Sequence, residues 1–144
     1  MDQLFGTDGI RGLAGEFPLD ANTIRKVGAS LARQHAENLG RDPRFVTGRD
    51  TRESGEWIEQ AFHAGAASEG AVCESAGVIT TPGVAYLTRA FDFDAGVVIS
   101  ASHNPFYDNG IKVFQPSGRK IDDMTERLIE ADVFEAVEAT GCAD

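Results

Sequence analysis

Residues 95–114 read AGVVISASHNPFYDNGIKVF. A β-branched apolar run ends abruptly in a small polar cluster at residues 100–105, and a second apolar run follows a turn signal at Asn109-Gly110. The pattern predicts a buried strand, a polar loop at its carboxyl end and a returning strand. Open α/β sheets bind ligands at the carboxyl ends of their strands, so we expect a ligand site at this loop.

The loop and the return strand gather four groups that could carry chemistry: the hydroxyl of Ser102, the imidazole of His103, the amide of Asn104 and the amine of Lys112. Ser102 is either a turn residue or a nucleophile. A serine hydrolase is disfavoured, because adjacent Ser and His do not form a triad and no Gly-x-Ser-x-Gly elbow is present. Lys112 interrupts a strand otherwise suited to burial. It is either an edge-strand lysine that opposes aggregation or a cation or base beside Ser102.

Three arginines lie in other polar stretches of the chain. Arg11 lies in the glycine-rich segment 4–12, which we expect to be a loop, and its guanidinium suits either an oxyanion or a structural salt bridge. Arg49 and Arg52 follow a short apolar run and have the same two alternatives. For both we favour a structural role, with Asp50 as a partner.

Strands and helices are expected to alternate along the chain, which predicts an α/β domain with helices on both faces of a sheet. The fold expected is a three-layer α/β/α sandwich with a mixed sheet of about four strands. The sheet should be mixed because the last two strands are joined too closely for a parallel crossover. The expected strands cover 44–48, 71–79, 95–101 and 111–115, and the expected helices 21–39, 54–68, 82–91 and 122–139. Residues 20–23 offer caps for the first helix, which Gly40 should end, and Thr81 is the expected cap of the third. Trp57 is expected on the buried side of the second helix.

Composition limits the class of protein and its partners. The 144 residues have the length of one domain, and the net charge of -10 argues against nucleic acid and anionic membranes as partners. No apolar run approaches a membrane span, and the amino terminus does not read as a secretory signal. Cys73 and Cys142 have no metal-ligand spacing, and a disulfide between them is disfavoured, so we expect a cytoplasmic protein. Ten Arg and three Lys beside 23 acidic residues resemble the surfaces of proteins from salt-loving organisms.

Five motifs, in this order, indicate a known family: FGTDGIRG at 5–12, GRDTR at 48–52, TTPGVAYLTR at 80–89, SASHNP at 100–105 and DNGIK at 108–112. The chain resembles the first domain of the α-D-phosphohexomutase superfamily, most closely that of the phosphoglucosamine mutases. The motifs cover most of the 144 residues, and their combination is specific.

The resemblance implies an interconversion of hexose 6-phosphate and hexose 1-phosphate, with glucosamine phosphate as the first candidate substrate. Ser102 would be the phosphoserine that donates its phosphoryl group, giving a 1,6-bisphosphate that reorients and returns its other phosphate. Lys112 would act as general acid/base or charge stabiliser, with Arg11 near the phosphoserine. His103 and Asn104 would shape the loop, and Thr7 would lie in the phosphate neighbourhood.

The resemblance also implies that residues 1–144 are the phosphoserine-bearing domain of a four-domain enzyme, with domains II to IV absent from this chain. Mg²⁺ would be held by the phosphate on Ser102 together with ligands from domain II. The isolated chain is therefore expected to be inactive, and its uncovered surface could lead to self-association. Two alternatives remain: a phosphomannomutase or phosphoglucomutase of the same family, and a non-catalytic sugar-phosphate-binding module.

Overall fold

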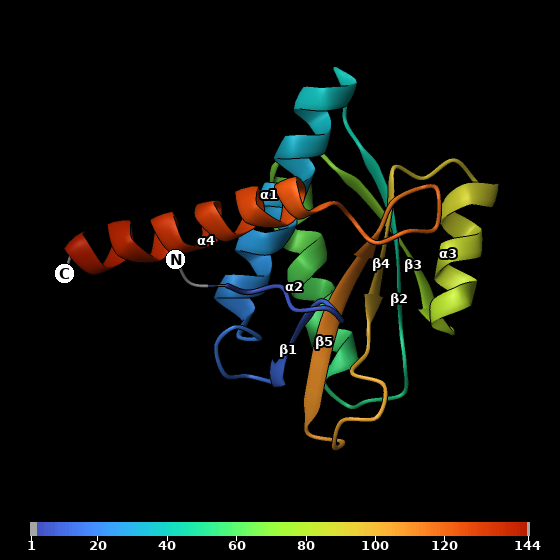
Figure 1. Cartoon of the computed structure of the whole chain (residues 1–144), viewed down its shortest axis with the longest axis horizontal. Coiled ribbons are helices and arrows are strands. Elements are labelled where there is room, and N and C mark those ends of the chain that lie inside the picture. Colours follow the sequence, from blue (N-terminus) through green and yellow to red (C-terminus); the bar gives the residue numbers. More distant parts are fainter. Residues whose placement is uncertain (1–2, 144) are drawn as a thin grey trace.

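The computed structural model describes residues 3–143, and the side chains of residues 3–135. Helices lie on both faces of one mixed sheet, as the sequence predicts (Figure 1). The strands are β1 (Ile10–Leu13), β2 (Arg44–Arg49), β3 (Val72–Val78), β4 (Ala95–Ile99) and β5 (Asp108–Phe114), and the helices are α1 (Ala21–Leu39), α2 (Gly55–Ser68), α3 (Thr81–Ala90) and α4 (Asp123–Ala143).

Two apolar cores, one on each face of the sheet, make the three layers. The larger core joins α1, α2 and α4 to one face, with Phe45 and Phe62 fully buried at its centre. The smaller core lies on the other face of the sheet, where Val84 of α3 packs against Val98 of β4. Figure 1 shows α3 alone on its side of the sheet, and α4 crossing α1 and continuing away from the other elements. The three-layer α/β/α prediction is confirmed.

The sheet has five strands, in the order β1-β5-β4-β2-β3, where the sequence predicted about four. β4 is parallel to β2 and antiparallel to β5, so the sheet is mixed as expected. The additional strand, β1, lies in the glycine-rich segment that was expected to be a loop. It forms because Ile10 is fully buried and pairs with Ile111 of β5. Gly9 permits this close approach, since a Cβ on it would lie 2.3 Å from the Ile111 carbonyl oxygen.

The turn before β5 lies earlier than predicted. Asn109 and Gly110 belong to the strand, and the turn is closed by the Asp108 N–H, which donates to the Pro105 carbonyl oxygen at 3.0 Å. Asn109 is fully buried and donates its side-chain amide to Ser54 Oγ at 2.8 Å. An Asn-Gly pair usually marks a solvent-exposed turn, but here the asparagine joins β5 to the start of α2.

Some helix ends and buried faces agree with the sequence expectation, and others differ. The expected cap Asp20 accepts from the Thr23 N–H, and Gly40 ends α1 in a left-handed conformation. α3, however, is capped by Thr80 rather than Thr81. Trp57, expected in the core, is 37% exposed. Within residues 3–143, no helix combines the length and the apolar character that a membrane span requires.

Candidate active site

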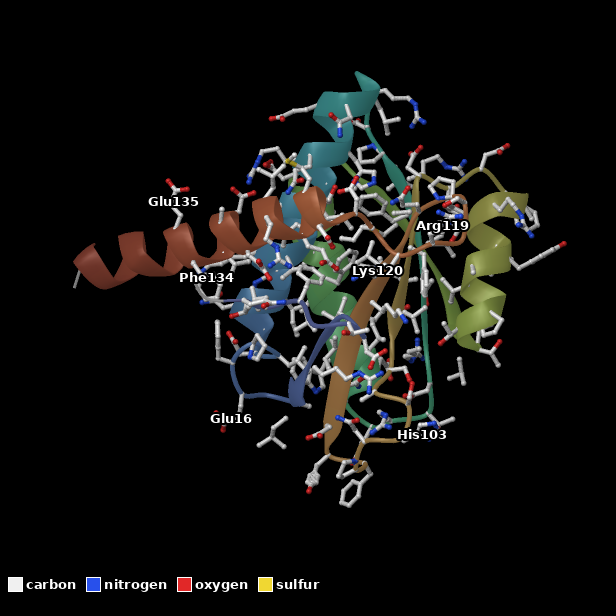
Figure 2. All side chains as sticks on the ribbon, in the orientation of Figure 1. Glu16, His103, Arg119, Lys120, Phe134 and Glu135 are labelled. Carbon is white, nitrogen blue, oxygen red and sulfur yellow. The ribbon has the colours of Figure 1, made fainter. Side chains whose placement is uncertain are left out.

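The polar loop after β4 lies where the sequence placed it, at the carboxyl ends of the parallel strands β2 and β4. Figure 2 shows His103 of this loop at the lower end of the sheet. The loop after β2 reaches the same end, since Arg49 pairs with Ile99 and the Asp50 N–H donates to the Ile99 carbonyl oxygen at 3.2 Å. Two loops from neighbouring strands therefore meet at one edge, in the arrangement that open α/β sheets use for ligands.

Ser102 presents its hydroxyl at the surface from a rare backbone conformation. Its φ is 50°, in the left-handed region that non-glycine residues seldom adopt. Its N–H donates to Ser100 Oγ at 3.1 Å, and Ser100 Oγ donates to Asp50 Oδ2 at 2.7 Å. Residues in this conformation cost energy and cluster at functional sites, so the geometry favours Ser102 as a functional side chain over a plain turn residue.

Arg11 reaches Ser102 from β1 by passing over β5. It pairs in register with Gly110, and a Cβ on Gly110 would lie only 3.2 Å from Arg11 Cγ. Nη1 donates to the Ala101 carbonyl oxygen at 3.0 Å and to Asn104 Oδ1 at 3.1 Å, and Nη2 lies 3.4 Å from Ser102 Oγ. Among the described residues, no carboxylate pairs with Arg11. The salt-bridge alternative therefore has no support, and the guanidinium is directed at the serine.

Arg52, from the loop after β2, contacts the same loop. Its Nε donates to Asp50 Oδ2 at 3.0 Å, so the predicted pairing of these two residues is confirmed. Its other two nitrogens donate to four main-chain carbonyl oxygens of the loop and the start of β5, those of Ser102, Asn104, Pro105 and Asp108. These contacts have no signal in the sequence, because carbonyl partners depend on how the loop is folded.

Lys112 lies on β5, opposite Val98 of β4, on the face that α3 covers. β5 is an interior strand, between β1 and β4, so the edge-strand alternative for this lysine is wrong. Its side chain is partly buried, with Nζ 5.5 Å from the Phe114 ring centroid, and within residues 3–135 it has no ion-pair partner. Lys112 follows Gly110 by two residues on β5, and the Gly110 carbonyl oxygen accepts from the Ser100 N–H at 3.0 Å. A partly buried cation without a counter-charge suits an anionic ligand.

The remaining predicted residues are Asn104, His103 and Thr7. Asn104 accepts from Arg11 and donates Nδ2 to Asp108 Oδ2 at 3.2 Å, so it ties the loop together. His103 is exposed and makes no side-chain hydrogen bond in the described part of the chain. Thr7 and Arg11 line a surface depression of about 420 Å³, and Ser102 lines another of about 420 Å³. The two depressions share no lining residue, and the contact between Arg11 and Ser102 links them.

A buried polar network beneath β2 was not foreseen from the sequence. Glu59 of α2 is only 4% exposed and accepts from Arg49 Nη1 at 2.6 Å and from Thr47 Oγ1 at 2.6 Å. Thr47 Oγ1 also lies 2.7 Å from His63 Nε2. Burial lowers the pKa of His63, against the attraction of the Glu59 carboxylate. Arg49 is structural as predicted, but its partner is Glu59 rather than Asp50.

The described side chains do not form a metal site by themselves. No group of three or more His, Cys, Asp or Glu side chains with suitable geometry occurs among them. Cys142 lies outside the described side chains, while burial raises the pKa of the Cys73 thiol to about 11, so this thiol is unreactive.

Residues 2–140 match the family model described as "Phosphoglucomutase/phosphomannomutase, alpha/beta/alpha domain I". The chain belongs to this family. It is similar to the phosphoglucosamine mutase of Solibacter usitatus, with 55% identity over 136 residues, which are 94% of this chain and 30% of that protein. The phosphoglucosamine mutase of Koribacter versatilis is 54% identical over 132 residues, 92% of this chain and 28% of that protein.

Solved structures of the same family show the same fold. The chain matches a "putative phosphomannomutase" from Thermus thermophilus with a TM-score of 0.77 and 29% identity, over 90% of this chain and 29% of that one. A phosphoglucomutase/phosphomannomutase family protein from Burkholderia thailandensis gives a TM-score of 0.75 at 25% identity, over 92% and 30%. The chain thus spans about 30% of the length of the curated relatives it matches.

Proposed function

We propose that this chain is the phosphoserine-bearing domain of a phosphohexomutase and that Ser102 carries the phosphoryl group. The observation that carries the proposal is the contact of 3.4 Å between Arg11 Nη2 and Ser102 Oγ, made by a guanidinium that has no carboxylate partner among the described residues. A phosphoserine carries a charge of about -1.5 to -2 at neutral pH, and a planar guanidinium binds phosphate oxygens through paired N–H groups.

In the proposed reaction, the bond from phosphorus to Ser102 Oγ breaks as a bond to a free hydroxyl oxygen of the sugar phosphate forms. The hydroxyl proton leaves to a base and Ser102 Oγ regains a proton, and Lys112 is the candidate for this exchange. The bisphosphate then reorients and returns its other phosphoryl group to Ser102. Catalysis of such transfers depends on positioning and on charge neutralisation at the transferred group, which Arg11 and Lys112 would supply in a chain of net charge -10.

Glucosamine phosphate is the substrate we propose, because relatives with 54–55% identity are named phosphoglucosamine mutases. Assays of full-length protein with the 6-phosphates of glucosamine, mannose and glucose test this choice. The proposal predicts the highest kcat/KM for glucosamine 6-phosphate, and a preference for mannose or glucose 6-phosphate would contradict it.

We further propose Mg²⁺ as the metal cofactor. A phosphate on Ser102 would supply one oxygen ligand, and the other ligands would come from the remaining mutase domains. Bound there, Mg²⁺ would add positive charge at the transferred group. The partners proposed are a hexose phosphate, the remaining mutase domains and, for the isolated domain, a second copy. The cytoplasmic location and the salt-loving source stay predictions.

A chimera tests the central role of Ser102. In it, this chain replaces the matching segment of the Solibacter usitatus phosphoglucosamine mutase. The chimera should convert glucosamine 6-phosphate to the 1-phosphate, and Ser102→Ala should lower kcat by about 1,000-fold or more because the covalent route is lost. Ser100→Ala, two residues away on the same loop, should lower it far less. Turnover by Ser102→Ala at the parent rate would contradict the proposal, and turnover by the isolated 144-residue chain would contradict the expected need for other domains.

A further inference from the structure

We propose that Arg52 is a positioning residue that holds the Ser102 loop in the shape required for phosphoryl transfer. Its effect on catalysis rests on the function proposed for Ser102, whereas its effect on the loop can be measured independently. The Arg52 side chain is only 10% exposed, although the surrounding loops lie at the surface. A buried guanidinium needs hydrogen-bond partners for its donors, and here those partners are the main chain of the reactive loop.

The contacts of Arg52 converge from both halves of the loop. Nη2 donates to the carbonyl oxygens of Ser102 at 2.9 Å and Asn104 at 3.0 Å, and Nη1 donates to those of Pro105 at 2.6 Å and Asp108 at 3.2 Å. One rigid, planar group therefore fixes the direction of four peptide carbonyls between the nucleophile and the first residue of β5. A lysine could not replace it, because an ammonium is a single point without a planar fork of donors.

Asp50 sets the orientation of that guanidinium and also reaches the nucleophile by a second route. Its Oδ2 accepts from Arg52 Nε at 3.0 Å and from Ser100 Oγ at 2.7 Å, and its Oδ1 accepts from the Arg52 N–H at 3.0 Å. Ser100 Oγ in turn accepts from the Ser102 N–H at 3.1 Å. The loop after β2 thus holds Ser102 on both sides, at its N–H through Ser100 and at its carbonyl through Arg52.

This double hold accounts for the left-handed conformation of Ser102. A non-glycine residue at a φ of 50° persists only when its surroundings over-determine the backbone. The hold directs Ser102 Oγ outward, within reach of Arg11 Nη2. Arg11 and Arg52 then have separate tasks. Arg11 faces the hydroxyl that would carry phosphate, while Arg52 is paired with Asp50 and directs its remaining donors to carbonyls, so it acts on geometry.

Hydrogen exchange of the 144-residue chain, read by mass spectrometry, tests the hold in Arg52→Lys. The hydrogen-bonded amides of Ser102, Asn104 and Asp108 should exchange at least about tenfold faster than in the parent chain, because several charge-assisted hydrogen bonds that hold the loop are lost, while amides of β2 and β4 keep their protection. Arg41→Lys is the matched control. Arg41 forms a two-point pair with Asp94 at the opposite end of the sheet, so its replacement should leave residues 101–108 unchanged. Unchanged exchange of this loop in Arg52→Lys would overturn the proposal.

If Arg52→Lys loses protection from hydrogen exchange throughout the sheet, Ser100→Ala is used instead, because it deletes only the link between Asp50 and the Ser102 N–H. Faster exchange confined to residues 101–104 supports the hold, and no change there contradicts it. The catalytic consequence is read in the chimera, where Arg52→Lys should lower kcat about 100-fold, as expected for a misplaced reacting group, with KM changed less than about threefold. A fall in kcat/KM that lies wholly in KM would contradict the positioning role. If the parent chimera never carries phosphate on Ser102, the proposed function fails, and hydrogen exchange still decides the role of Arg52.

Discussion

The two ends of the sheet use arginine in different ways. At the end where β2 and β4 begin, Arg41 forms a two-point pair with Asp94, whose Oδ2 also accepts from the Arg44 N–H. At the end where these strands finish, Arg52 donates chiefly to main-chain carbonyls and Arg11 pairs with no described carboxylate. At the first end the charge of Arg41 is matched by Asp94. At the second end positive charge is left beside Ser102, which is where an anionic group would be bound.

Of the changes that compare the two ends of the sheet, Arg11→Lys in the chimera should have the largest effect. Lysine keeps the charge but cannot contact the Ala101 carbonyl, Asn104 and Ser102 together, so kcat should fall about 100-fold or more, as for loss of a preorganised donor to the transferred group. Steady-state assays measure this. Arg41→Lys, which changes the same side chain at the charge-matched end, should stay within about threefold of the parent. Equal losses in both variants would show that the two ends do not differ as proposed.

Gly110→Ala tests the path of Arg11 over β5. The added Cβ would lie 2.8 Å from the carbonyl oxygens of Ile10 and Ser100 and 3.2 Å from Arg11 Cγ, so the backbone must shift. We expect the free energy of unfolding, from urea denaturation, to fall by about 1–3 kcal/mol.

Gly12→Ala is the control for this change. In the same strand pair its Cβ would meet Pro18 Cδ at 3.6 Å, an ordinary contact, and the free energy of unfolding should change by less than about 1 kcal/mol in either direction. Equal destabilisation by the two alanines would contradict the proposed crowding at Gly110.

The smallest expected effect is a pH dependence at the opposite end. Burial opposes ionisation of Asp94, but hydrogen bonds from Arg41 and the Arg44 N–H, with the attraction of Arg41, outweigh it and lower the pKa of Asp94 below 3.8. A carboxyl whose pKa is lower in the folded state stabilises the fold above its unfolded pKa, and this contribution is lost as pH falls below about 3.8.

Asp94→Asn should therefore flatten the fall in unfolding free energy below about pH 4, measured by urea denaturation at a series of pH values. Asp92→Asn, at an acid nearby in sequence with no ion pair in the described residues, should leave the slope unchanged. A slope in Asp94→Asn as steep as in the parent would argue that the pair with Arg41 adds no stability.

The sequence predicted the layers of the fold and the position of the reactive loop because both depend on apolar pattern and on the short connection between β4 and β5. It missed β1, because a four-residue strand within a glycine-rich segment is too short to show periodicity and forms only against β5. Lys112 illustrates the same limit. Its alternation along the strand was visible in the sequence, but only the order of strands shows that β5 is interior.

Some contacts of Arg52 could likewise be predicted from the sequence and others could not. The pairing of Arg52 with Asp50 could be predicted from their closeness in sequence and opposite charge. The carbonyl contacts of Arg52 and the left-handed backbone of Ser102 could not, since both arise from the folded loop. Trp57 was placed in the core by helical spacing, yet it lines an open surface depression with Phe106 and Tyr107.

Peptide mapping by tandem mass spectrometry directly tests whether Ser102 is the phosphoryl carrier. The chimera would be incubated with a hexose 1,6-bisphosphate, digested and compared with Ser102→Ala and Ser100→Ala. We predict a single phosphoryl group on Ser102, absent from Ser102→Ala and retained in Ser100→Ala. A phosphoryl group on Ser100, or a chimera that turns over without phosphate on Ser102, would contradict it.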